Sequence, residues 1–91
     1  MPRLQIRVGS VLFFRMWFWA VDRRINDSWR LRALKTSRFL CLPQWELWES
    51  CQNGQCKLVA PDGGSRMEAM EMSSLRALAR QMMRLAEPPE V

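Results

Sequence analysis

The longest apolar stretch of the chain, residues 8–21, carries an arginine, Arg15, near its centre. A membrane-spanning helix needs about 20 apolar residues without a central charge, and this stretch is shorter. A secretion signal needs an unbroken apolar centre followed by a small-residue cleavage site, which is absent after Trp19-Ala20-Val21. We therefore expect the stretch to supply part of the core of a cytoplasmic protein.

The length of 91 residues and the hydrophobic fraction of 48% are typical of one globular domain. We expect a single domain over residues 1–91. It would comprise a basic and aromatic segment at 1–35, a strand meander with a closing helix at 36–87, and a frayed tail at 88–91. The expected class is α+β.

The first segment is expected to be helix-rich. Alternating polar and apolar residues at positions 3–8, with Leu4, Ile6 and Val8 on one side, predict a short strand. Ser10 then predicts the N-cap of a helix over residues 11–25. The aromatic and β-branched residues at 11–19 favour a strand as the alternative. Residues 29–35 fit either a short helix or a strand.

The second segment is expected to form a three- or four-stranded antiparallel meander. A strand over Phe39 to Leu42 ends at Pro43, which cannot donate to a central ladder. Residues 45–51 alternate, and Asn53-Gly54 predicts a type I′ hairpin turn to a return strand over residues 56–60. Residues 66–70 fit a further strand, or a helix that begins at the capping-box pattern of Ser65 and Glu68.

A closing amphipathic helix is predicted over residues 75–86, with Ser73 or Ser74 as N-cap. Its apolar stripe consists of Leu75, Leu78, Ala79, Met82, Leu85 and Ala86. Another face carries Arg76, Arg80 and Arg84 without interleaved acids, and like charges four residues apart repel each other. We interpret these arginines as a secondary basic edge that contacts phosphate or carboxylate groups.

The predicted hairpin register assigns side chains to its two faces. The core face would hold Trp45, Leu47, Cys51, Cys56, Leu58 and Ala60. Ser50 and Lys57 would face solvent, and Trp48 would be an exposed aromatic residue. Cys51 opposite Cys56 allows a disulfide, but a cytoplasmic location favours reduced thiols and would leave Cys41 unpaired in either case.

Catalysis and metal binding are not expected. The chain has no histidine, which is the commonest general base and metal ligand near neutral pH. A zinc site at the three cysteines would therefore need a carboxylate as its fourth ligand. The glycine-rich segment 62–65 matches no nucleotide-binding pattern. We expect neither enzymatic activity nor a cofactor.

Positive charge is concentrated in the first 38 residues. They carry nine Arg and Lys against two acids, whereas the remaining 53 residues have a net charge of −2. Arginine beside tryptophan is typical of protein-interface hot spots and of nucleic-acid grooves. Trp17, Trp19 or Trp29 would anchor the centre of the contact. The expected partner-binding residues are Arg15, Arg23, Arg24, Arg30, Arg32, Lys35, Arg38, Trp29 and Trp48.

Two functions fit this pattern, and we favour a protein-binding inhibitor or adaptor. Phages and mobile elements encode such proteins, for example against host defence. The basic face would engage an acidic patch on a host or cognate protein, such as part of a nucleic-acid-handling complex, and block it sterically. The clustering of the aromatic residues and the acidic second half of the chain favour this function, because acids repel a wrapped phosphate chain. No membrane partner is expected.

The alternative is direct binding of RNA or DNA. A helix, an antiparallel meander and a closing helix follow the order of the double-stranded-RNA-binding domain. The segment Pro43-x-Trp45-Glu46-Leu47 resembles its first strand, and Ser73-Ser74 before an arginine-bearing helix resembles the start of its second helix. The Gly-Pro-x-His element and the lysine cluster of that family are absent. The resemblance implies a nucleic-acid-binding topology.

Overall fold

Four strands follow one another as an antiparallel meander in the first half of the chain, and a fifth strand returns to pair with the first. The computed structural model describes residues 6–86. Its five strands form one sheet in the order β4-β3-β2-β1-β5. They are β1 (Val11–Phe14), β2 (Trp17–Ile25), β3 (Ser28–Ala33), β4 (Phe39–Pro43) and β5 (Cys56–Ala60). The helices in the described range are α1 (Gln44–Gln52), α2 (Gly64–Glu68) and α3 (Met72–Ala86).

The helix predicted over residues 11–25 was wrong, because this segment forms β1 and β2. A two-residue turn, Arg15-Met16, joins the strands, with Phe14 paired to Trp17. The side chains of β1 are buried on both faces of the sheet. A strand covered on both sides has a continuous apolar sequence, which resembles that of a buried helix. The aromatic and β-branched side chains of this segment favour a strand.

Ser10 closes a loop and does not cap a helix. Its hydroxyl donates to the Pro61 carbonyl at 2.8 Å and accepts from the backbone N–H of Arg7 at 3.0 Å. The residue is fully buried. The strand predicted over residues 3–8 does not form at positions 6–8, and its first residues, Leu4 included, lie outside the described range.

Strand β2 continues past β1 and pairs with β3, which confirms the strand alternative for residues 29–33, whereas residues 34–35 form a turn. The register between β2 and β3 shifts between Val21 and Arg23, so Asp22 has no directly opposed partner. A bulge of this kind bends the strand and increases its twist. The turn between the strands is Asn26-Asp27, where Asn26 adopts a positive φ of 53°.

The predicted Asn-Gly hairpin does not exist, because residues 44–52 form helix α1. Gly54, with a φ of 77°, ends that helix. Its N–H bonds to the Cys51 carbonyl at 3.3 Å, and the Gln55 N–H bonds to the Ser50 carbonyl at 2.9 Å. These two bonds form a Schellman motif. A type I′ turn and a Schellman motif both need a residue with positive φ, so Asn53-Gly54 does not distinguish them.

The strand predicted at residues 39–42 is confirmed as β4. The strand at 56–60 is also present, but β5 pairs with β1, because no strand forms at 45–51. Residues 64–68 take the helical alternative as α2, and the closing helix begins at Met72, three residues earlier than predicted. The side chains of Leu85 and Ala86 lie outside what the structure describes, as do residues 88–91. Four strands precede the first helix, so the element order of the double-stranded-RNA-binding domain is not present.

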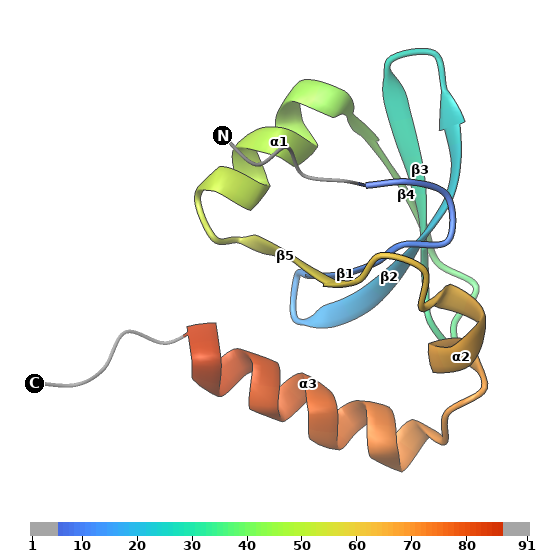
Figure 1. Cartoon of the computed structure of the whole chain (residues 1–91), viewed down its shortest axis with the longest axis vertical. Helices are drawn as coiled ribbons and strands as arrows, with labels where there is room; N and C mark the ends of the chain where they lie inside the picture. The colour runs from blue at the N-terminus through green and yellow to red at the C-terminus, as the bar shows by residue number, and fades with distance from the viewer. Residues whose placement is uncertain (1–5, 87–91) are drawn as a thin grey trace, which may run out of the picture.

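Two apolar clusters lie on opposite faces of the sheet, and Figure 1 shows α1 and α3 on opposite sides of β1, β2 and β5. Leu12, Leu31 and Leu47 belong to the cluster under α1. Phe18, Leu34 and Leu75 belong to the cluster under α3. Burial of each such side chain stabilises the fold by about 1.5–3 kcal/mol. No helix within residues 6–86 is long and apolar enough to cross a membrane.

Candidate protein-binding groove

Trp17 and Trp19 help to hold the sheet together. The indole N–H of Trp17 donates to the Leu34 carbonyl at 2.9 Å, and that of Trp19 donates to the Phe14 carbonyl at 2.7 Å. Trp19 is buried and Trp17 is partly buried. Buried tryptophans typically satisfy their N–H in this way. Of the three tryptophans expected to anchor the contact, Trp19 is thus buried, and Trp17 and Trp29 are partly buried.

Helix α1 exposes two other tryptophans, Trp45 and Trp48. The helix buries Leu47 and Ser50, which lie three residues apart on its inner side. Trp45 is therefore 67% exposed, and Trp48 is 37% exposed. The hairpin register had placed Trp45 in the core and Ser50 in solvent, and both assignments were wrong because the period of a helix differs from that of a strand. The predicted exposure of Trp48 is confirmed.

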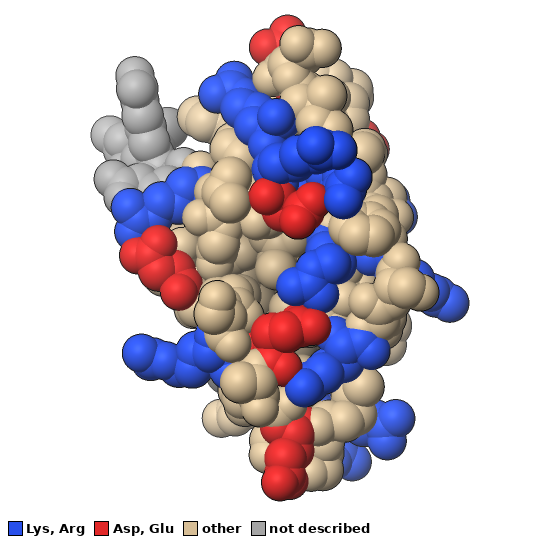
Figure 2. Space-filling model, turned by 90° about the vertical axis from the view of Figure 1, so that its right-hand side faces the viewer, with Lys and Arg blue, Asp and Glu red and all other residues tan. Residues whose placement is uncertain are grey.

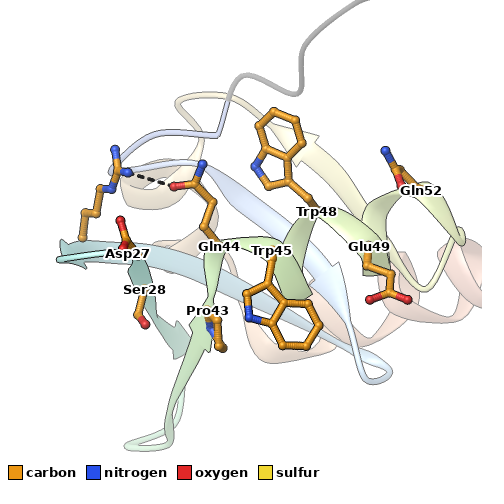
Figure 3. Close-up of a pocket in the computed structure, with 9 residues that line it drawn as sticks. Asp27, Ser28, Pro43, Gln44, Trp45, Trp48, Glu49 and Gln52 are labelled. Atoms are coloured by element: carbon orange, nitrogen blue, oxygen red, sulfur yellow. Dashed lines mark hydrogen bonds between the residues drawn. The ribbon is translucent and has the colours of Figure 1, made fainter.

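Trp45 and Trp48 line a groove of about 960 Å³ between α1 and the β2–β3 turn. Figure 3 shows the two rings projecting in different directions from the helix, with Glu49 and Gln52 further along it. The backbone N–H of Gln44 donates to the Asp27 carbonyl at 2.7 Å and so fixes the start of α1 against the turn. We call this site the Trp groove, and its lining residues are Arg24, Asp27, Ser28, Pro43, Gln44, Trp45, Trp48, Glu49 and Gln52.

Arg24 is held in place at one end of the Trp groove. Its guanidinium donates to the side-chain oxygen of Gln44 at 2.8 Å, drawn as a dashed line in Figure 3, and to the Asn26 carbonyl at 3.1 Å. It also lies 5.5 Å from the ring centroid of Trp29, which is half-buried. This is a cation–π distance. Three contacts thus hold the Arg24 side chain at the wall of the groove without a ligand.

The Trp groove contains charges of both signs. Asp27 and Glu49 are exposed, and neither forms an ion pair with another residue in the described range. Arg24 is the one cation among the described residues that line it. A groove of this composition suits a ligand with both polar and apolar groups better than a uniformly anionic one.

Arg30 and Arg32 lie on the outer face of the sheet in ion pairs. Arg30 is 2.8 Å from Asp22, and Arg32 is 3.0 Å from Glu68 of α2. The Arg30 guanidinium also stacks over Phe39 at 4.2 Å. Figure 2, which views this side of the molecule, shows acidic side chains beside basic ones and not a single basic field. The charge of these two arginines is therefore largely compensated.

The remaining expected site residues do not gather on one face. Lys35 and Arg38 are exposed in the connection between β3 and β4, at the end of β3 opposite to the Trp groove. Arg15 is exposed at the β1–β2 turn, and Arg23 is exposed next to Arg24. Arg76, Arg80 and Arg84 are exposed on α3. The structure brings together Arg24, Trp29 and Trp48, and it adds Trp45.

Cys51 and Cys56 are both free thiols, and their side chains are hydrogen-bonded to each other. The hydrogen bond from Cys56 lowers the pKa of Cys51, outweighing the opposite effect of partial burial. The same hydrogen bond, together with burial, raises the pKa of Cys56. Cys41 is exposed and apart from this pair. Within residues 6–86, no group of three Cys, Asp or Glu side chains has the geometry of a metal site.

These features define a small α+β protein with an ordered aromatic groove beside its first helix. No family model, no curated protein and no solved structure matches the chain.

Proposed function

We propose that the protein is a non-enzymatic binding module, an inhibitor or adaptor that engages a partner protein through the Trp groove. The observation that carries the proposal is the 67% exposure of Trp45 above a groove shared with Trp48. Tryptophan and arginine are the residue types most enriched in interface hot spots, where they fill desolvated pockets. Arg24 lies in the same groove, so the hot-spot residue types occur together.

The charge pattern of the groove supports a protein partner over nucleic acid. Asp27 and Glu49 would repel a phosphate chain laid along the tryptophans. A protein can complement both signs. We infer a partner with an apolar segment for the groove, an acidic patch that meets Arg23 and Arg24, and a neutral or basic group near Asp27 and Glu49.

Steric occlusion is the mechanism that we propose. A standard interface covers about 800 Å² on each partner. That is roughly an eighth of the 6490 Å² of accessible surface of this molecule, so the interface would extend beyond the Trp groove onto the adjoining β2–β3 turn. Most of the domain would then lie outside the contact, where it would block access to the neighbouring surface of the partner. We propose that it acts in this manner against a host machine, as an accessory protein of a phage or mobile element.

Capture of the partner from a nuclease-treated host lysate tests the proposal. Trp45→Ala removes the exposed anchor and leaves the core intact. Phe39→Ala is the matched control, because Phe39 is also exposed, at 49%, but lies outside the groove. We expect Trp45→Ala to weaken capture about 30-fold, the effect of a 2 kcal/mol hot spot, and Phe39→Ala to leave it unchanged. Equal capture by both variants would overturn the proposal.

A further inference from the structure

The outward face of α3 carries a row of three arginines. Arg76, Arg80 and Arg84 are exposed, and none of them forms an ion pair with another residue in the described part of the chain. The helix contains no acidic residue from Met72 to Ala86. Like charges four residues apart destabilise a helix by a few tenths of a kcal/mol per pair. Among residues 6–86, no acidic side chain compensates this repulsion through an ion pair.

The row winds slowly around the helix, because residues four apart are rotated by about 40° around its axis. Residues four apart are separated by about 6 Å along a helix axis, so the three guanidinium groups extend along about 12 Å of surface. The other exposed residues between Arg76 and Arg84, Ala77 and Gln81, are uncharged. This face therefore offers regular positive charge and hydrogen-bond donors, and it offers no aromatic anchor.

The arginine row and the Trp groove are on opposite sides of the sheet. Leu75 and Ala79 of α3 pack in the apolar cluster on one face, whereas Leu47 of α1 packs in the cluster on the other. Figure 1 shows the two helices separated by β1, β2 and β5. A ligand on α3 would not compete with one in the groove. The outward face of α3 and the Trp groove are therefore two separate surfaces of the protein.

We propose that Arg76, Arg80 and Arg84 bind the phosphate backbone of a nucleic acid without reading its sequence. Guanidinium groups bind phosphate oxygens through paired, charge-assisted hydrogen bonds. An acidic protein is a poorer fit, because this face lacks the aromatic or apolar anchor of a protein interface. A lipid surface is also a poorer fit, because the apolar side of α3, with Leu75 and Ala79 buried, packs on the sheet. Together with the Trp groove, this surface would allow the protein to bind its partner on or near RNA or DNA.

Fluorescence anisotropy with a labelled single-stranded RNA 20-mer of mixed sequence tests the proposal, with salt varied from 50 to 200 mM. Three phosphate contacts predict a slope of log affinity against log salt near −2, so binding weakens roughly 10- to 20-fold over this range. The triple variant Arg76→Gln, Arg80→Gln, Arg84→Gln is expected to bring the slope close to zero. The triple Lys variant is expected to keep it. Circular dichroism confirms that α3 is intact in both variants.

Three controls separate this proposal from its alternatives. Arg23→Gln with Arg24→Gln is expected to leave the slope unchanged, and Trp45→Ala is expected to leave RNA binding unchanged even if it abolishes capture of the partner. Polyglutamate and anionic vesicles are expected to bind at least 10-fold more weakly than the RNA. An unchanged slope in the triple Gln variant would overturn the proposal. Equal binding of polyglutamate or vesicles would also overturn it.

Discussion

Trp45 and Trp48 lie one helical turn apart on α1 and line the same groove, but Trp45 is 67% exposed and Trp48 is 37% exposed. The difference follows from their angular positions on the helix, because Trp45 lies almost opposite the inner side marked by Leu47 and Ser50, whereas Trp48 lies closer to that side. The rest of the protein covers much of the Trp48 side chain, whereas most of the Trp45 side chain is exposed to solvent. The two residues should therefore respond differently to truncation.

Trp48→Ala is expected to lower the free energy of unfolding by about 1–2 kcal/mol, because it removes an aromatic ring that is partly covered by the fold. Trp45→Ala is expected to change it by less than about 0.5 kcal/mol. Urea denaturation followed by circular dichroism measures both values. Equal losses of stability would mean that Trp45 is part of the core, contrary to its place in the structure.

The β1–β2 turn has the positive φ at both central residues that defines a type I′ turn, but neither of these residues is glycine or asparagine. Arg15 and Met16 have φ values of 52° and 68°, which glycine and asparagine adopt at much lower cost. The double substitution Arg15→Asn with Met16→Gly is expected to stabilise the protein by about 1–2 kcal/mol. Thermal unfolding measures the gain. A lower melting temperature in the double variant would contradict the type I′ geometry of this turn.

Gly54→Ala is expected to destabilise the protein by about 1 kcal/mol, because alanine is strained at the φ of 77° that ends α1. Nothing lies within 4 Å of a Cβ atom added there, so the cost is one of backbone conformation and not of collision. Gly54→Asn is the matched control and should cost less, since asparagine tolerates this conformation. Chemical denaturation of the two variants measures the difference. The interpretation fails if asparagine costs as much as alanine.

The Cys51 thiol is expected to ionise at a lower pH than its ordinary pKa of 9.0, because the Cys56 thiol donates a hydrogen bond to it. A lowered pKa means that thiolate, the reactive form, is present at lower pH. In a Cys41→Ser background, the rate of alkylation by iodoacetamide should rise with pH along a curve whose midpoint lies below 9.0. Cys56→Ala removes the hydrogen bond and should move the midpoint upward. An unmoved midpoint would show that Cys56 does not stabilise the thiolate.

Elements whose sequence pattern fits one type of secondary structure could be predicted, and elements whose pattern fits both a helix and a strand could not. Residues 56–60 and 39–42 were assigned correctly as strands, because short apolar runs bounded by Pro or Gly suit strands. Residues 11–25 were misassigned, because burial of β1 on both faces of the sheet removes the alternation that marks a strand. The assignment of residues 45–51 depended on the meaning of Asn53-Gly54, which ends a helix as readily as it turns a hairpin.

The Trp groove could be predicted only in part. Trp48 was identified as exposed, and Arg24 and Trp29 were expected to contact the partner. Trp45 was not identified as exposed, because the two-residue alternation of the predicted strand placed its side chain on the core face. The spacing of Leu47, Ser50 and Cys51 by three and four residues is a helical signal that would have identified it. The contact between α1 and the β2–β3 turn depends on tertiary packing, as do the ion pairs of Arg30 and Arg32.

Site-specific photo-crosslinking tests the central claim most directly. A photoreactive residue is placed at Gln52, which is exposed in the Trp groove, or at Gln81, which is exposed on α3. After irradiation in host lysate, we predict one dominant protein adduct from position 52, absent when Trp45→Ala is added, and no protein adduct from position 81. A protein adduct from position 81 alone, or one from position 52 that persists with Trp45→Ala, would contradict the assignment of the groove as the protein-binding site.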